Sequence, residues 1–169
     1  MPAIFLSTLR KSLQCAVFAG LAISLSAMAA DLTWTGSISS DWNDPANWTP
    51  QQVPTAIDHV IINTGSVTIP VTAAFAIMDW SDSTISGSLT VANDAVLNVP
   101  AEAGYINLTG VLTNYGTINW SNGTWYVVNG ANTYTGAIYN EPGGLIDARG
   151  DLIMEDSSFP NGFFINAGI

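Results

Sequence analysis

The sequence predicts an all-β fold: a right-handed parallel β-helix (solenoid) of about four to five coils with a tryptophan-rich N-terminal cap. Three observations lead to this prediction. Glycines recur at near-equal spacing, short runs of strand-favouring residues lie between them, and the chain beyond its leader has no sustained helical apolar period. An antiparallel β-sandwich is the alternative, because its turn signals also recur along the chain. The regular spacing of the glycines favours the solenoid.

Composition excludes several classes of partner. The 169 residues include 3 lysines and arginines against 13 aspartates and glutamates, which gives a net charge of −10. Nucleic-acid binding requires basic side chains that neutralise phosphates, so no nucleic-acid partner is expected. The same charge disfavours anionic membranes and anionic polysaccharides. Because 48% of the residues are hydrophobic and only 9% are charged, we expect a folded domain rather than an acidic tail.

Residues 1–29 have the pattern of a secretory signal peptide. Arg10 and Lys11 form a basic start, and residues 15–27 form an apolar stretch that is too short to span a bilayer. The small-x-small pattern Ala27-Met28-Ala29 predicts cleavage that leaves Ala30 or Asp31 as the new N-terminus. We therefore expect a secreted or cell-surface protein without membrane insertion after cleavage. The only cysteine lies in the leader, so disulfides and cysteine-bound metals are not expected.

Residues 30–59 form a segment of different composition, which is predicted to cap the first coil. Trp34, Trp42 and Trp48 either plug that coil or form an aromatic platform on which a sugar ring stacks. Oxygen-bearing side chains that could hold calcium follow one another at Asp41, Asn43 and Asp44. The EF-hand pattern fails in this segment, and solvated turn acids explain the three residues more simply. We therefore expect no metal and no cofactor.

Residues 60–169 carry the repeat. Glycines 65, 87, 110, 136 and 162 are spaced by 22, 23, 26 and 26 residues. The residue two positions after each glycine is apolar, which predicts an internal ladder of Val67, Leu89, Leu112, Ile138 and Phe164. The residue four positions after each of the last three glycines is Asn114, Asn140 or Asn166, which predicts a second ladder of hydrogen-bonded amides.

Three strings in the N-terminal segment carry a resemblance to a known class of protein. They are Thr33-Trp34-Thr35-Gly36, the Asp41-Trp42 and Asn47-Trp48 pair, and the run from Pro54 through Asp58-His59-Val60. Together they resemble the start of large secreted bacterial repeat proteins of the autotransporter-passenger and surface-adhesin type. The resemblance implies β-helical coils and a cell-surface scaffold. Its implied partners are further coils of a longer chain and a host or environmental glycan or surface.

The function predicted from the sequence is a non-catalytic structural scaffold of the adhesin type. Two alternatives remain, a carbohydrate-binding or carbohydrate-processing β-helix and a truncated gene fragment without independent function. Glycoside hydrolysis would need two carboxylates, for which Asp147 and Asp151 are the candidates on either side of Arg149. We expect the chain to be truncated, because Phe163-Phe164-Ile165 would leave an apolar open end.

Overall fold

The computed structural model describes residues 28–69, 73–128, 136–156 and 163–169. The signal peptide predicted for residues 1–29 lies outside these residues except for its last two positions. Within the described ranges the regular structure is short β-strands and a single 3-10 turn, η1 (Pro45–Asn47). No helix in these ranges has the length and apolarity needed to cross a bilayer.

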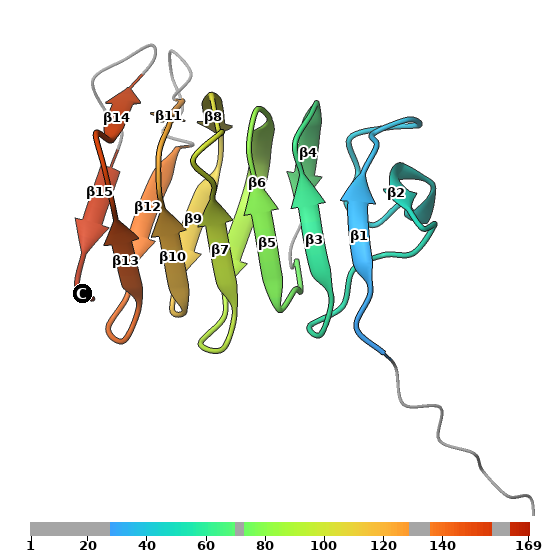
Figure 1. Ribbon diagram of the computed structural model, residues 1–169, viewed down its shortest axis with the longest axis horizontal. Helices are drawn as coiled ribbons and strands as arrows, with labels where there is room; N and C mark the ends of the chain where they lie inside the picture. Colours follow the sequence, from blue (N-terminus) through green and yellow to red (C-terminus); the bar gives the residue numbers. More distant parts are fainter. Residues whose placement is uncertain (1–27, 70–72, 129–135, 157–162) are drawn as a thin grey trace, which may run out of the picture.

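In the described part of the chain, fifteen strands form two sheets (Figure 1). The seven-stranded sheet contains, in chain order, β1 (Asp31–Trp34), β2 (Trp48–Thr49), β3 (His59–Ile62), β5 (Ile77–Trp80), β7 (Val96–Val99), β10 (Thr117–Trp120) and β13 (Leu145–Ala148). The eight-stranded sheet contains β4 (Ser66–Ile69), β6 (Thr84–Val91), β8 (Tyr105–Leu108), β9 (Val111–Asn114), β11 (Thr124–Val127), β12 (Ala137–Asn140), β14 (Ile153–Asp156) and β15 (Phe163–Asn166). The β1–β2 pair is antiparallel, and every other pairing between these strands is parallel.

The core lies between the sheets and follows from alternation along the strands. In β3, β7, β9 and β10 every second side chain is buried and the others are partly exposed. Successive side chains of a strand point to opposite faces, so each strand places two side chains inside. Both are apolar in β3, β7 and β10, whereas β9 buries Leu112 and Asn114. Met78, Leu97 and Ile118 are fully buried at matching positions of β5, β7 and β10. Burial of this apolar ladder is the main force that holds neighbouring strands together.

The predicted right-handed parallel β-helix of four to five even coils is wrong. The all-β content is confirmed, but the described strands form parallel and mixed sheets that curl into a half-barrel. β6 shows the irregularity, because its first residues pair with β4 and β8 while its later residues pair with β9. Recurring glycines specify which residues of neighbouring strands lie opposite one another, but they do not specify how the sheets close.

The predicted apolar ladder is also corrected at its first member. Leu89, Leu112, Ile138 and Phe164 lie opposite one another in register on β6, β9, β12 and β15. Val67 instead lies opposite Ile85, so it belongs to a different column. The spacing of 22 residues after Gly65 therefore does not mark the same register as the later spacings. The physical reason is the length of β6, which provides eight residues where the neighbouring strands have four.

Asp58 joins three parts of the fold at the start of β3. Its Oδ1 accepts a hydrogen bond from the Ala30 N–H at 2.8 Å, and its Oδ2 accepts one from the Thr55 N–H at 2.8 Å and one from the Thr55 hydroxyl at 2.6 Å. Its backbone carbonyl accepts from the Ala76 N–H at 2.8 Å, next to β5. The residue is only 1% exposed. Burial alone would raise the pKa of this carboxyl, but the hydrogen bonds from Thr55, Ala30 and Gln52 outweigh it and lower the pKa.

We expect Asp58→Asn to flatten the acid limb of the stability profile. The unfolded carboxyl has its ordinary pKa of 3.8 and the folded one a lower value, so ionised Asp58 stabilises the fold above that pH. This contribution is lost as the pH falls through the folded pKa. Urea unfolding followed by circular dichroism between neutral pH and pH ~2 measures it. A variant that loses stability on acidification as steeply as the parent would contradict the assignment.

Candidate functional site

The asparagine column predicted from the sequence lies inside the eight-stranded sheet. Asn114 Nδ2 donates to Asn140 Oδ1 at 2.7 Å, and Asn140 Nδ2 donates to Asn166 Oδ1 at 2.7 Å. Asn114 and Asn140 are at most 1% exposed. The side-chain oxygens of Asn114 and Asn166 also accept hydrogen bonds from the N–H groups of Gly116 and Gly168, each at 3.2 Å. These bonds close the chain turns after β9 and β15. Asn114 and Asn140 are thus engaged in bonds between strands, whereas Asn166 at the end of the column is exposed.

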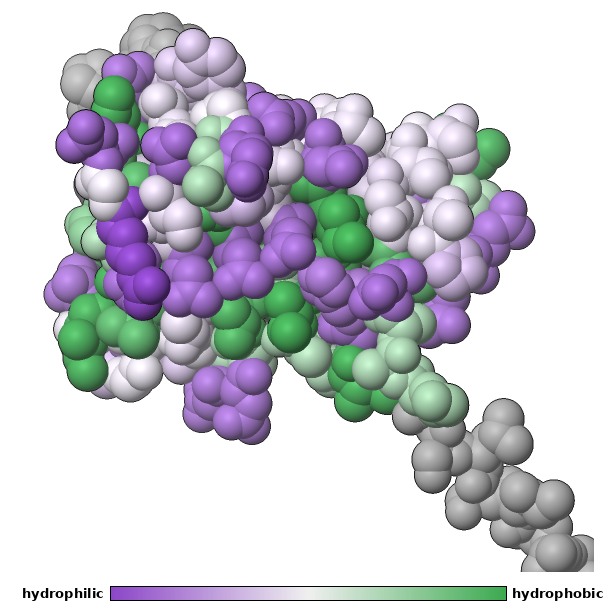
Figure 2. Space-filling model, in the orientation of Figure 1, coloured by the Kyte–Doolittle hydropathy of each residue, from purple (hydrophilic) through white to green (hydrophobic). Residues whose placement is uncertain are grey.

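A second polar row crosses the outer face of the seven-stranded sheet. Asp79, Asn98, Asn119 and Asp147 lie opposite one another on β5, β7, β10 and β13. Figure 2 shows hydrophilic side chains crossing this face as a band, with hydrophobic side chains beneath it. Asn98 Nδ2 donates to Asp79 Oδ1 at 2.8 Å, and Asn119 Nδ2 donates to Asn98 Oδ1 at 2.9 Å. The side chains of this row therefore also serve largely to hydrogen-bond one strand to the next.

His59 and Arg149 on this face each contact aspartate side chains. His59 lies between two carboxylates, with Nδ1 at 3.1 Å from Asp31 Oδ1 and Nε2 at 3.0 Å from Asp79 Oδ2. Arg149 donates to both oxygens of Asp147. The hydrogen bond from Arg149 lowers the pKa of Asp147. A glycosidase acid needs a raised pKa, so Asp147 is not suited to donate the proton in that reaction. The Asp147–Asp151 pair stays a prediction from the sequence.

The calcium candidates Asp41, Asn43 and Asp44 hold a turn. Asp41 Oδ1 accepts from the Asn43 N–H at 2.9 Å, and Asp44 Oδ1 accepts from the Ala46 N–H at 2.9 Å at the start of η1. Within the described residues no three His, Cys, Asp or Glu side chains gather as a metal site would require. The turn explanation weighed from the sequence fits these contacts.

The three N-terminal tryptophans are in the core. Trp34, Trp42 and Trp48 are each 1% exposed. Trp48 makes edge-to-face contacts with both of the others at centroid distances of 4.9 Å, and its indole N–H donates to the Trp42 carbonyl at 2.8 Å. A sugar-stacking platform needs an exposed ring face. The burial of Trp34, Trp42 and Trp48 leaves no ring accessible to a sugar, so their contacts favour the alternative in which they plug the first coil.

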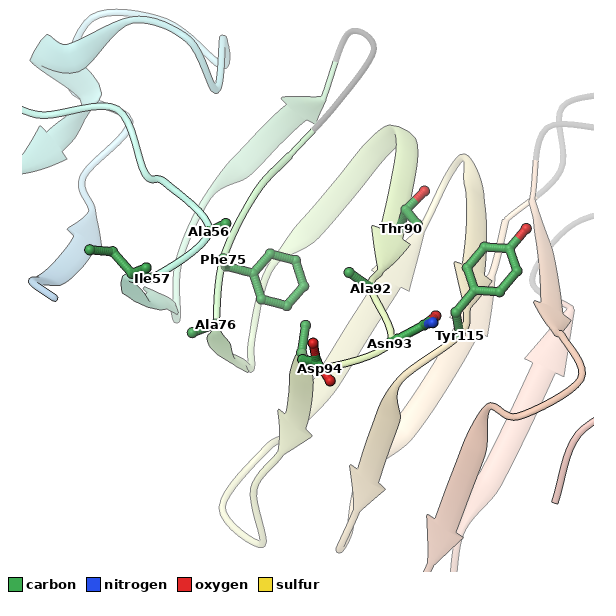
Figure 3. Close-up of a pocket in the computed structure, with 10 residues that line it drawn as sticks. Ala56, Ile57, Phe75, Ala76, Thr90, Ala92, Asn93, Asp94 and Tyr115 are labelled. Carbon is green, nitrogen blue, oxygen red and sulfur yellow. The ribbon is translucent and has the colours of Figure 1, made fainter. Parts of the chain in front are cut away.

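A groove of about 770 Å³ opens along the chain turns next to the seven-stranded sheet (Figure 3). We call it the Tyr115 groove, and its lining comprises Ala56, Ile57, Phe75, Ala76, Thr90, Ala92, Asn93, Asp94, Ala95 and Tyr115. Figure 3 shows Phe75 in the middle, with Ile57 and Tyr115 toward opposite ends. Phe75 is 4% exposed and forms part of the floor, whereas Tyr115 is 41% exposed. The groove is concave because alanines line it at several successive turns.

The polar side of the groove is held in place by backbone contacts. The turn that carries Asn93 and Asp94 is closed by the Ala95 N–H, which donates to the Ala92 carbonyl at 2.9 Å. Tyr115 is fixed beside it, because its own N–H donates to the Val91 carbonyl at 2.9 Å. A Cβ at Gly116 would lie 2.1 Å from the Ala92 carbonyl oxygen, so only glycine allows this approach. These backbone contacts fix the positions from which Asn93, Asp94 and Tyr115 extend their side chains into the groove.

Sequence reasoning missed this groove, since no motif marks it. Alanines and a turn with Asn93 and Asp94 are ordinary loop composition, and Tyr115 stands next to the more conspicuous Asn114. The available signal was an aromatic residue directly after a strand that ends in a buried asparagine. Such a residue leaves the sheet at a turn, where a side chain is exposed.

Comparison of the chain with family models, curated proteins and solved structures gave no match. The Tyr115 groove combines an exposed aromatic ring, hydrogen-bonding side chains and an apolar floor, which are the parts of a small-molecule binding site.

Proposed function

We propose that this chain is an exported, non-catalytic structural protein of the surface-adhesin type whose Tyr115 groove holds one residue of a neutral glycan. The observation that carries the proposal is the half-exposed Tyr115 ring beside Asn93 and Asp94, over a floor of alanines and Phe75. The C–H face of a pyranose packs on an aromatic ring. Its hydroxyls both donate and accept hydrogen bonds, as the Asn93 amide and the Thr90 hydroxyl also do.

Charge argues for a neutral sugar. The chain carries a net charge of −10, and the groove itself contains Asp94 but no basic residue. A uronate or a sialic acid would be repelled by this field. An organic cation would find a single exposed carboxylate and an apolar floor, and the donor groups of Asn93 and Thr90 would be unused. A neutral pyranose uses both the donors and the acceptors of the groove.

The structural part of the proposal rests on how the polar side chains are engaged. Asp58 and Asp79 accept hydrogen bonds from other segments of the chain. The buried asparagine column likewise joins three strands. Groups with these roles stiffen a scaffold, and they support a surface protein that presents a site rather than one that performs a reaction.

Adhesion of coated beads tests the proposal. The exported chain is coupled to beads, which are allowed to settle on surfaces bearing neutral oligosaccharides, uronate-containing oligosaccharides or none. We expect adhesion to a neutral glycan, and we expect Tyr115→Ala to weaken it about tenfold through loss of ring stacking. Tyr105→Ala is the matched control, because Tyr105 is 63% exposed on β8 and does not line the groove.

Several outcomes would contradict the proposal. Adhesion confined to uronate-containing surfaces would reverse the charge argument. Equal losses in Tyr115→Ala and Tyr105→Ala would remove the groove from the interaction. Release of free sugar from the surface by the beads would show that the protein is an enzyme.

A further inference from the structure

The buried carboxylate of Asp58 lacks a counter-charge among the described residues. The described chain contains one arginine and one histidine, and these face Asp147 and the pair Asp31 and Asp79. Asp58 is 1% exposed and receives only neutral donors from Thr55, Ala30 and Gln52. Those donors stabilise the ionised carboxylate, but they bring no positive charge to offset its own. Its environment is therefore incomplete in the unprocessed chain.

The missing charge can come from the backbone nitrogen that already touches Asp58. Ala30 N lies 2.8 Å from Asp58 Oδ1, and the Ala30 carbonyl is held by the His59 N–H at 2.9 Å. Burial also changes at this position. Met28 is 87% exposed and Ala29 is exposed, whereas Ala30 packs against the hydrophobic core. The leader predicted from the sequence ends at this same boundary.

We propose that signal-peptide cleavage between Ala29 and Ala30 places a new α-ammonium group on the buried Asp58 carboxylate, and that this ion pair completes the fold of the mature protein. The inference rests on the export proposed above and not on the glycan groove. It chooses Ala30 over Asp31 as the mature N-terminus, because cleavage one residue later would remove the nitrogen that meets Asp58.

The reaction is hydrolysis by a signal peptidase of the exporting cell. The C–N bond between Ala29 and Ala30 breaks and water is consumed. The oxygen of the water bonds to the Ala29 carbonyl carbon, and the signal peptide leaves with a C-terminal carboxylate. Its two protons reach the Ala30 nitrogen, which becomes –NH₃⁺. Ala30 thus gains a charge and two further donors at the place where it already donates one hydrogen bond to Asp58.

The sequence allows this ammonium group to be neutralised selectively. The chain from Ala30 onward contains no lysine, so its α-amine is the only primary amine. Acetylation of the unfolded mature protein, followed by refolding, therefore removes this one charge. We expect acetylation to raise the unfolding equilibrium constant at least about tenfold, as measured by urea titration. In Asp58→Asn the same acetylation should have little effect, which isolates the pair in a double-mutant cycle.

A chain with one additional glycine before Ala30 provides a second measurement if Asp58→Asn does not fold. It keeps an ammonium group but moves it away from Asp58, so it should be as unstable as the acetylated protein. Equal effects of acetylation with and without Asp58 would overturn the proposal, as would full stability of the glycine-extended chain. The mass of the exported protein separates the two proposals. Failure of export yields no processed chain, whereas failure of the ion pair yields a chain starting at Ala30 that is insensitive to acetylation.

Discussion

Replacing Asn140 with leucine should lower the free energy of unfolding by about 3 kcal/mol. The Asn140 side chain accepts from Asn114 Nδ2 at 2.7 Å and donates to Asn166 Oδ1 at 2.7 Å and to the Ile169 carbonyl at 3.2 Å. Leucine has the same number and branching of side-chain heavy atoms but cannot replace these bonds. Asn114, which is fully buried, would keep an amide proton without an acceptor, and water cannot reach it.

The matched control for this change is Asn119→Leu. Asn119 also sits in a row of polar side chains, but it is half-exposed and donates one side-chain hydrogen bond, to Asn98 at 2.9 Å. Water replaces the lost contact there, so the expected loss is below about 1 kcal/mol. Urea titration of both variants by circular dichroism gives the comparison. Equal losses in the two variants would show that burial of the column does not set its contribution.

Gly110→Ala should destabilise the protein by about 3 kcal/mol or more, or prevent it from folding. A Cβ at Gly110 would lie 1.9 Å from the Gly87 carbonyl oxygen and 2.6 Å from the Gly87 nitrogen. These are backbone atoms next to paired strands, since β6 and β9 are hydrogen-bonded in register from Ser88 and Val111 onward. Relief of the clash would require the two strands to separate locally.

Gly143→Ala separates this steric effect from backbone strain. Gly143 has φ of +94°, but a Cβ there would meet nothing within 4 Å. Its expected cost is therefore conformational alone, about 1–2 kcal/mol. Thermal and urea unfolding of the two variants would measure the difference. A Gly143→Ala variant as unstable as Gly110→Ala would mean that contact between glycines is not what specifies the recurring positions.

The sequence was informative about local register and weak on how the strands are assembled. Glycines from Gly87 onward precede residues that pair in register, and Asn114, Asn140 and Asn166 bond as a column. Both patterns arise from contacts between neighbouring strands, so the residues involved recur at regular spacing in the sequence. The double pairing of β6 produces no regular spacing in the sequence, so the spacing of the glycines places Val67 in the wrong column.

The residues of the proposed glycan site are harder to predict for a different reason. Tryptophan side chains can pack in a core or stack on a sugar ring. Trp42 and Trp48 differ from the residues of a sugar-binding platform only in exposure, which composition does not encode. The Tyr115 groove depends on concavity, and concavity depends on small residues at turns that are distant in sequence. Only the arrangement of the turns brings Phe75 and Tyr115 into one groove.

Burial of the tryptophans also has an optical consequence. All six are at most 6% exposed, and they form two edge-to-face groups, one of Trp34, Trp42 and Trp48 and the other of Trp80, Trp120 and Trp125. Indole emission moves to longer wavelength when water reaches the ring, so each group acts as an intrinsic fluorophore for its own part of the chain. Coincident spectral shifts of the two groups during denaturation would indicate one cooperative unit. Separate shifts would indicate that the N-terminal segment opens independently of the later strands.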